Sequence, residues 1–272
     1  MKKFYLSFIF FMAALSLLMA SQSVPGSSYN AKLRWLDANA QNGGNYAIEF
    51  NTNQDIDPTL FSYKDRKNIS ITITGVGAKL VILSLNTDRK EDSMFAVGSG
   101  VTLILNDKLE LRGRNNSTIN SYSLITVDSG GSLIMNNGKI TGHYHNFAGG
   151  GGGVYVAGSF TMNGGEISGN FCSPQSVEVV GGSGVFVAKG GILTMNGGKI
   201  SDNYGTAGCC GLFVDVGGTL TMSGGEISNN AVGGVRVCGA FTMSGGEISN
   251  NKNGGVYVSG TFIMKGGKIS AN

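Results

Sequence analysis

A motif repeated along the C-terminal half of the chain limits its possible folds more than any other feature of the sequence. Its methionines are separated by 27, 33, 27, 21 and 21 residues, and an isoleucine follows each methionine by five residues. In the last five copies an asparagine follows that isoleucine by three. The methionines are Met135, Met162, Met195, Met222, Met243 and Met264. Such repetition is typical of solenoids, in which each copy is one unit that packs on the next.

Each copy contains three short runs in which apolar residues alternate with other residues. In the last copy these runs are residues 256–258, 262–264 and 268–270, and glycines separate them. Alternation with a period of two is typical of β-strands, and glycine tolerates the positive φ of a tight corner. Because the strands are too short to form a sheet within one copy, we predict that successive copies pair in parallel, about 4.8 Å apart. Since parallel crossovers are almost always right-handed, the sequence predicts an all-β fold, a right-handed parallel β-helix solenoid with three short strands in each coil.

Stacking of equivalent positions also predicts what each column of residues does. The apolar positions should form interior ladders, and the asparagines should stack at one corner with their amides hydrogen-bonded along the axis. The position before each isoleucine points outward and holds a lysine or a glutamate, namely Lys139, Glu166, Lys199, Glu226, Glu247 and Lys268. Most neighbours in this column have opposite charges, so we interpret it as a solvated part of the scaffold.

The N-terminus has the pattern of an export signal. Two lysines, Lys2 and Lys3, precede an apolar run over residues 4–20, and small residues follow it. A membrane anchor is the alternative, although a run of 17 residues is at the lower limit for a membrane span. We therefore predict that residues 1–23 are a signal peptide and that the protein is secreted or lies at the cell surface, on the outer membrane or outside the cell. Loss of both lysines lowers the formal net charge from +3 to about +1, which gives no basic face for nucleic acid.

The rest of the chain should consist of a cap and a rod. Residues 24–44 should be a linker with a short capping helix over residues 31–41, because the first coil would otherwise expose unpaired strand edges and an open core. Residues 45–272 should form the β-helix, with irregular coils over residues 45–94, regular coils over residues 95–272, and about nine coils in all.

Insertions fall at one corner of the coil, after the third strand. They occupy residues 112–122, 143–152, 171–183 and 204–210. Insertions on one face of a solenoid often mark a binding face, although neutral variation at an exposed turn would give the same pattern. The final coil should leave its edges and core open, so either the sequence is a fragment or this end meets further repeats or another chain.

The outward position of the first strand is mostly aromatic. Successive coils have Thr126, Tyr155, Phe186, Phe213, Arg236 and Tyr257 at this position. We predict that the aromatic residues and Arg236 form an exposed ligand-binding face, because such rings bind sugars and other flat apolar surfaces. The alternative is that the rings stack on one another or are covered by a loop.

Cysteines and histidines supply further candidates. Cys172 lies in an insertion at the same corner as Cys209 and Cys210 one coil later, so we predict a disulfide between Cys172 and one of them in the exported protein. Zinc is not expected because the C-x-x-C spacing is absent. His143 and His145 lie in a loop without acidic residues, so we interpret them as solvated. We predict no metal site, no cofactor and no catalytic residue.

One pattern recurs along the chain, namely Gly-Gly-Val-Tyr-Val followed by Phe-Thr-Met-x-Gly-Gly-Glu-Ile-Ser-x-Asn. With this pattern the chain resembles the right-handed β-helix repeat proteins of bacterial cell surfaces, within the pectate-lyase-like superfold. The resemblance covers about residues 45–272. It implies the fold, whereas its members include both adhesin-like proteins and polysaccharide lyases and hydrolases. The polygalacturonase-like members carry a set of strings, Asn-Thr-Asp, Asp-Asp, Gly-His-Gly and Arg-Ile-Lys. This chain does not have that set, and residues 142–145 depart from the third string.

These observations favour a non-catalytic function. We predict an exported surface or adhesin-like scaffold that presents its loops and an aromatic face to an extracellular polysaccharide or to a host or matrix polymer. The alternative is a polysaccharide-acting enzyme, a lyase or a glycoside hydrolase, whose catalytic set is unusual. Glycosidases need two facing carboxylates, and the glutamates of the outward column stand next to lysines that would pair with them.

Overall fold

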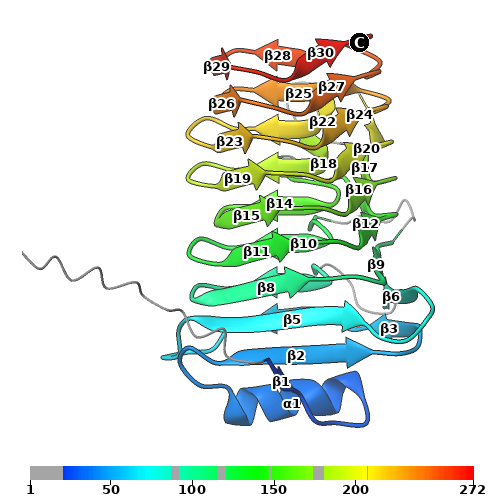
Figure 1. The fold of residues 1–272 in the computed structure, drawn as a ribbon, viewed down its shortest axis with the longest axis vertical. Coiled ribbons are helices and arrows are strands. Elements are labelled where there is room, and N and C mark those ends of the chain that lie inside the picture. The colour runs from blue at the N-terminus through cyan, green and yellow to red at the C-terminus, as the bar shows by residue number, and fades with distance from the viewer. Residues whose placement is uncertain (1–20, 87–91, 115–120, 147–148, 174–180, 207) are drawn as a thin grey trace, which may run out of the picture.

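The structure is a computed structural model that describes residues 21–86, 92–114, 121–146, 149–173, 181–206 and 208–272. Strands wind into a stack of coils, and one helix lies against the N-terminal end of the stack (Figure 1). All strand pairs between successive coils are parallel, as in Ile125–Val127 on Val154–Val156. The predicted parallel β-helix is therefore confirmed.

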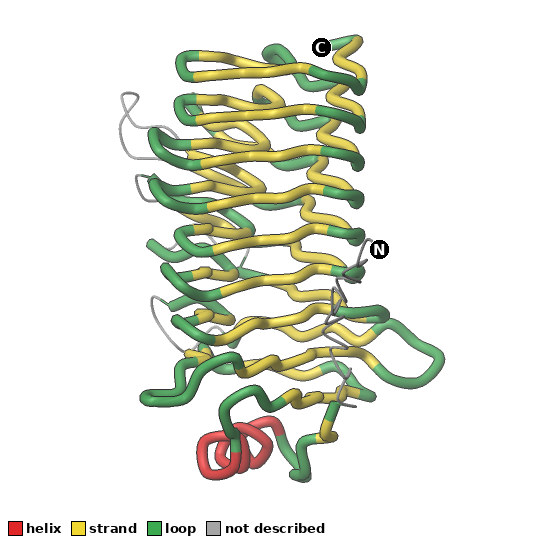
Figure 2. The backbone as a smooth tube through the Cα atoms, turned by 60° about the vertical axis from the view of Figure 1, so that its left-hand side comes forward, coloured by secondary structure: helices red, strands yellow, loops and turns green. Residues whose placement is uncertain are grey.

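Three long parallel sheets form the sides of the rod, and Figure 2 shows their strands stacked coil upon coil. The ten-stranded sheet contains β1 (Gln22–Ser23), β2 (Asn45–Phe50), β5 (Ile69–Gly75), β8 (Val101–Leu105), β11 (Ser132–Met135), β15 (Ser159–Met162), β19 (Ile192–Met195), β23 (Thr219–Met222), β26 (Ala240–Met243) and β29 (Thr261–Met264). The nine-stranded sheet contains β3 (Gln54–Ile56), β6 (Val81–Leu85), β9 (Leu109–Arg112), β12 (Lys139–Thr141), β16 (Glu166–Ser168), β20 (Lys199–Ser201), β24 (Glu226–Ser228), β27 (Glu247–Ser249) and β30 (Lys268–Ser270).

The third side is an eight-stranded sheet, and a small sheet lies beside it. The eight-stranded sheet contains β4 (Thr59–Phe61), β7 (Phe95–Val97), β10 (Ile125–Val127), β14 (Val154–Val156), β18 (Gly181–Val187), β22 (Cys209–Val214), β25 (Gly233–Val237) and β28 (Val256–Val258). The three-stranded sheet contains β13 (Tyr144–His145), β17 (Phe171–Cys172) and β21 (Tyr204–Gly205). Apart from β1, the ten-stranded sheet has one strand for each coil, which gives the nine coils expected from the sequence.

The methionine ladder lies inside the rod, in the predicted register. Met162 pairs with Met195, and the pairing continues through each later methionine to Met264. The methionines of the earlier coils are fully buried, but 46% of Met264 is exposed. The expectation that Met264 is interior is therefore wrong in this structure, because β29 belongs to the last coil and no coil covers it.

Asparagines form a second ladder, which is polar and is buried except at Asn272 in the last coil. The side-chain amide of each asparagine donates to Oδ1 of the next, at 3.1 Å from Asn170 to Asn203, 3.2 Å from Asn203 to Asn230, and 2.9 Å for the last two steps, Asn230 to Asn251 and Asn251 to Asn272. Each amide also donates to an isoleucine carbonyl of the preceding coil. Because buried amides are costly unless they are hydrogen-bonded, this ladder fixes which residues lie above one another.

The predicted cap is present and begins two residues earlier than expected, as α1 (Tyr29–Asn39) rather than residues 31–41. The Ser28 side chain caps it by accepting an N–H from its first turn. Leu36 and Tyr29 are buried against the first coil. The helix therefore covers the core at this end, which is the function expected of a solenoid cap.

The start of the folded unit differs from the predicted domain boundary. Residues 1–20, which contain most of the predicted signal peptide, lie outside the described residues. Gln22–Ser23 were also assigned to it, but they form β1 and pair with β2. Val24 follows them and is buried. Among the described residues, no helix is long and apolar enough to cross a membrane.

Where the structure describes them, the insertions follow strands of the nine-stranded sheet and lead into strands of the eight-stranded sheet, which is the corner predicted. Parts of three of them form the three-stranded sheet, which sequence patterns did not predict because its strands have only two residues each. The rings of Tyr144 and Phe171 stack with their centroids 4.5 Å apart, and those of Phe171 and Tyr204 are tilted by 52° at 4.9 Å. The insertion corner is thus an ordered extension of the coil over these residues.

Candidate ligand-binding face

The outward face of the eight-stranded sheet has the predicted register. Thr126, Tyr155, Phe186, Phe213, Arg236 and Tyr257 are direct neighbours on successive strands from β10 to β28. One column therefore runs along most of the rod, as alternation in the sequence indicated. What the sequence did not establish is how much of each side chain reaches solvent.

The centre of this column is a packed stack of rings. Tyr155 and Phe186 stack at 5.6 Å with 6° between their planes, and Phe186 and Phe213 stack at 5.1 Å with 14°. Only 4% of Phe186 and 1% of Phe213 are exposed. The prediction of an exposed aromatic platform is wrong for these two residues, because their faces contact one another and Cys210 and Ala188 pack against them.

On the N-terminal side of the stack the face opens into a hollow of about 430 Å³, here called the aspartate hollow. The column holds the small side chains of Ala96 and Thr126 there, between Leu60 and Tyr155. Its lining residues are Pro58, Thr59, Leu60, Asp92, Ser93, Ala96, Tyr122, Thr126 and Asp128. Leu60 is 64% exposed, and partial burial raises the pKa of the Asp128 carboxyl. The hollow thus combines apolar surface with two carboxylates that can accept hydrogen bonds.

On the C-terminal side there is a second hollow of about 320 Å³, here called the arginine hollow. Its lining residues are Gly208, Cys209, Cys210, Gly233, Val235, Arg236, Asn253, Gly254 and Tyr257. Tyr257 is 68% exposed and Arg236 is half-buried. The aromatic and basic side chains expected to bind a ligand are therefore accessible at this hollow, beyond the buried stack.

A family comparison agrees with this architecture. The model of the family described as right-handed beta helix region matches residues 99–264, which is more than half of the chain. The chain belongs to the right-handed β-helix family. A search of the curated proteins and a search of the solved structures each found no match. Family membership thus establishes the right-handed β-helix fold, and function has to be argued from the face itself.

The outward charged column of this β-helix protein is paired as predicted. Ion pairs join Lys139 to Glu166 at 3.2 Å, Lys199 to Glu226 at 2.8 Å and Lys268 to Glu247 at 3.1 Å. The hydrogen bond from Lys199 lowers the pKa of Glu226. These glutamates are therefore ionised partners of lysines. Among the described residues, no group of three or more His, Cys, Asp and Glu side chains could hold a metal ion.

The cysteines are all free thiols, so the predicted disulfide is not formed in this structure. Cys209 packs against Cys172, whereas Cys210 packs against the aromatic stack. The sulfur of Cys209 donates to the carbonyl of Cys172 at 3.1 Å, and the hydrogen bond with Cys209, followed by burial, raises the pKa of the Cys172 thiol. The structure thus identifies Cys209 as the neighbour of Cys172.

His143 and His145 were expected to be solvated, but both are buried with 1% exposure. Nε2 of His143 lies 2.9 Å from the Tyr122 carbonyl, and its Nδ1 accepts the Arg114 N–H at 3.3 Å. This pattern fits a neutral ring with its proton on Nε2. The backbone N–H of His143 donates to Oδ1 of Asn170 at 3.2 Å. His143 therefore occupies the first position of the asparagine ladder.

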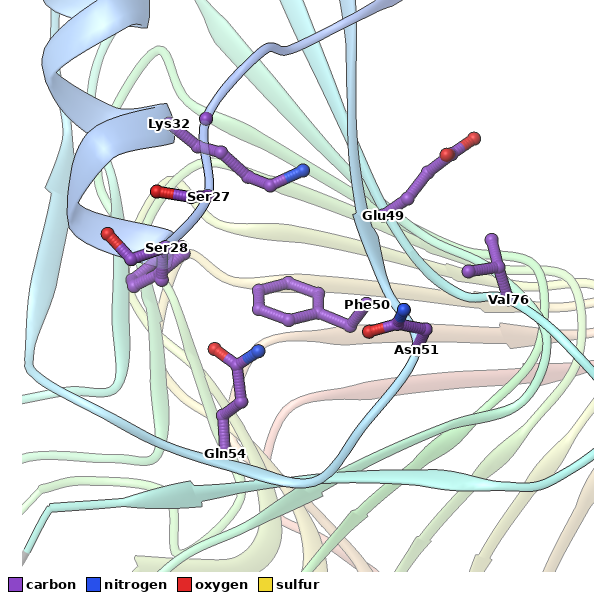
Figure 3. A pocket seen from close by; sticks show the side chains of 10 residues that line it. Ser27, Ser28, Lys32, Glu49, Phe50, Asn51, Gln54 and Val76 are labelled. Carbon is purple, nitrogen blue, oxygen red and sulfur yellow. The ribbon is translucent and has the colours of Figure 1, made fainter.

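A third hollow, of about 300 Å³, lies between the cap and the first coils (Figure 3). Figure 3 shows side chains from the start of the cap on one side and from the end of β2 on the other, namely Ser27, Ser28, Lys32, Glu49, Phe50 and Asn51. Nζ of Lys32 donates to the carbonyl of Val24 at 3.3 Å. We interpret this hollow as the junction of cap and rod, because it lies away from the outward column.

The burial of the ring stack predicts that Phe213→Ala is strongly destabilising. Removal of a buried phenylalanine ring leaves a cavity and should cost about 3 kcal/mol or more of unfolding free energy. Tyr257→Ala is the matched control, because it removes a mostly exposed ring from the same column and should cost less than about 0.5 kcal/mol. Urea unfolding measures both values. Equal values for the two variants would contradict the burial of the stack.

The burial of His143 predicts that the protein loses stability in acid. Burial is the main cause that lowers its pKa from 6.5 to about 4. The unfolded chain therefore takes up a proton near pH 6.5 that the folded chain binds only near pH 4. The neutral His143 ring therefore contributes to the free energy of unfolding above pH 6.5. About 3 kcal/mol of this free energy is lost as the pH falls towards 4.

Urea unfolding at pH 7 and pH 4.5 tests this dependence in the parent and in His143→Asn. Asparagine suits the ladder position and does not titrate, so the variant should lose clearly less stability in acid than the parent. Other groups titrate in both proteins, and the comparison cancels their contribution. The same pH dependence in both proteins would show that His143 is not the buried neutral group described above.

Proposed function

We propose that this right-handed β-helix protein is a non-catalytic, exported scaffold of the adhesin-like kind, which binds an extracellular polysaccharide or matrix polymer. The outward face of the eight-stranded sheet is its binding face. The observation that carries this proposal is the arrangement of that face, with one hollow on each side of a rigid ring stack. Leu60 is exposed at the first hollow and Tyr257 at the second, so apolar surface suited to sugar rings is accessible at both.

The repeat supports binding to a polymer rather than to one small molecule. Both hollows lie on the same column, so an extended chain along the rod axis could contact both at once. A rigid scaffold loses little entropy on binding. Two weak contacts on a rigid body also raise the overall affinity well above that of either one. The rod would thus act as a multivalent surface of fixed spacing.

Export and the absence of catalysis are supported by separate features of the sequence and structure. Residues 1–20 have the basic and apolar regions of an export signal. The glutamates of the outward column are held in ion pairs, as Glu226 is by Lys199. A carboxylate fixed in this way is a poor candidate for general acid catalysis, which needs a raised pKa.

Retention on immobilised polysaccharides tests the proposed function. The parent should be retained on at least one polymer, and Ala96→Phe, which fills the aspartate hollow, and Tyr257→Ala should each weaken binding about tenfold, the equivalent of about 1.4 kcal/mol. Ile192→Ala is the matched control, because Ile192 is 49% exposed but lies on the ten-stranded sheet. Lack of retention of the parent on any polymer, or equal loss in the control, would contradict the proposal.

One observation favours the alternative, a polysaccharide-acting enzyme. Asp92 and Asp128 both line the aspartate hollow, and hydrolases of this kind use two carboxylates. The sequence also contains Asn86-Thr87-Asp88, so one polygalacturonase-like string is present, although residues 87–91 lie outside the described residues. New reducing ends, or an unsaturated product that absorbs ultraviolet light, would establish this alternative if Asp128→Asn abolished their formation.

A further inference from the structure

We propose that the arginine hollow binds an anionic sugar residue, with the oxyanion on the guanidinium of Arg236 and the sugar ring against Tyr257. This inference rests on the proposed function and adds the charge of the ligand and the residue that recognises it. The oxyanion is a carboxylate or a sulfate ester, because both accept paired hydrogen bonds from a guanidinium.

The positive charge of Arg236 is not compensated within the described part of the chain. Its Nε atom is buried and has no hydrogen-bond partner there. The ion pairs between described residues involve Arg112, Lys139, Lys199 and Lys268, and none involves Arg236. A partly desolvated guanidinium without a partner is unfavourable. An anion that contacts the terminal nitrogens of this guanidinium would therefore gain free energy by compensating the charge.

The surroundings of Arg236 keep this charge in place. Its direct neighbour on β22 is Phe213, which is 1% exposed and cannot share hydrogen bonds with it. Its neighbour on β28 is Tyr257, whose ring is mostly exposed. Strands in a sheet are about 4.8 Å apart, so one sugar ring can contact Tyr257 while a group attached to it reaches Arg236.

The shape of the hollow follows from the loss of the insertions along the rod. The insertion at residues 204–210 places Gly208 and Cys209 as one wall, and the next two coils lack such an insertion. Gly233 pairs with Cys210, Gly254 has the same position one coil later, and both line the hollow, where the absence of side chains leaves space. A volume of about 320 Å³ has room for a sugar residue.

The charge of the residues that line the arginine hollow also favours an anionic ligand. None of the residues that line this hollow is acidic, and Arg236 is the only one of them that carries a full charge. The aspartate hollow at the other side of the ring stack has the opposite character, with Asp92 and Asp128 in its lining. Charge complementarity therefore assigns the anionic part of a ligand to the arginine hollow, not to the aspartate hollow.

Polymers that share one backbone test this inference. The probes are immobilised dextran, carboxymethyl dextran and dextran sulfate, and retention is measured at low and high salt. We expect the parent to bind at least one anionic probe tenfold or more tightly than dextran. The carboxymethyl and sulfate arms distinguish the two oxyanions. Arg236→Gln should remove this preference, whereas Lys189→Gln, which removes an exposed charge outside the hollow, should change retention less than twofold.

Tyr257→Ala provides a second variant, which should weaken retention on the preferred anionic probe about tenfold even if Arg236→Gln does not fold. Equal retention of Arg236→Gln and the parent on all three probes would overturn the inference, and so would an equal loss in Lys189→Gln. Retention of the parent on dextran alone would overturn the inference and leave the proposed function intact. Lack of retention on these probes and on every other polysaccharide would overturn both.

Discussion

The whole structure depends on the parallel stacking of equivalent residues, one coil above the next. Each short strand gains its hydrogen bonds only from neighbouring coils, so no coil is stable alone. The stacking places residues of the same type above one another. Met195 pairs with Met222 inside the rod, and Ser201 pairs with Ser228 beside the asparagine corner. Any residue that suits its column is therefore repeated, and the repeat in the sequence is the direct consequence.

The buried asparagine ladder is the part of this stacking that tolerates least change. Apolar ladders accept neighbours of similar size, but an amide in a dry corner must find its partners at fixed positions. The residue before a ladder asparagine adopts positive φ, at 56° for Asp202, 53° for Asn229 and 56° for Asn250. This left-handed residue turns the chain at the corner and aims the next side chain inward. The ladder thus fixes both the register and the shape of the turn.

The candidate binding face arises where the regular stacking changes. Aromatic residues at the centre of the column stack and bury one another, as Phe186 and Phe213 do. At each side the column changes, to Thr126 and Ala96 in one direction and to Arg236 in the other. These changes leave the two hollows. A site of this kind is formed by departures from the repeat, while the repeat supplies the rigid support.

The sequence was sufficient to predict the fold, the interior ladders, the cap and the column of the candidate site. Period-two alternation and the shared spacing from methionine to asparagine were enough, because a solenoid converts sequence position into spatial position. Exposure was harder to predict. Phe186 and Phe213 point outward like Tyr257, and only their neighbours decide that they are buried. One feature of the sequence could have indicated the burial of His143. It lies three residues after Ile140, at the position where later coils have asparagine.

The most direct test of the stacked register is the unfolding free energy of Asn230→Ala compared with Asn196→Ala. Asn230 donates to the Ile200 carbonyl and to Oδ1 of Asn251 inside the rod, so its loss should cost about 3 kcal/mol. Asn196 makes the same kind of amide contact, with Asn163 at 3.0 Å, but at an exposed corner, and its loss should cost less than about 1 kcal/mol. The predicted result is this clear difference in urea unfolding. Equal costs would contradict a register fixed by the buried ladder.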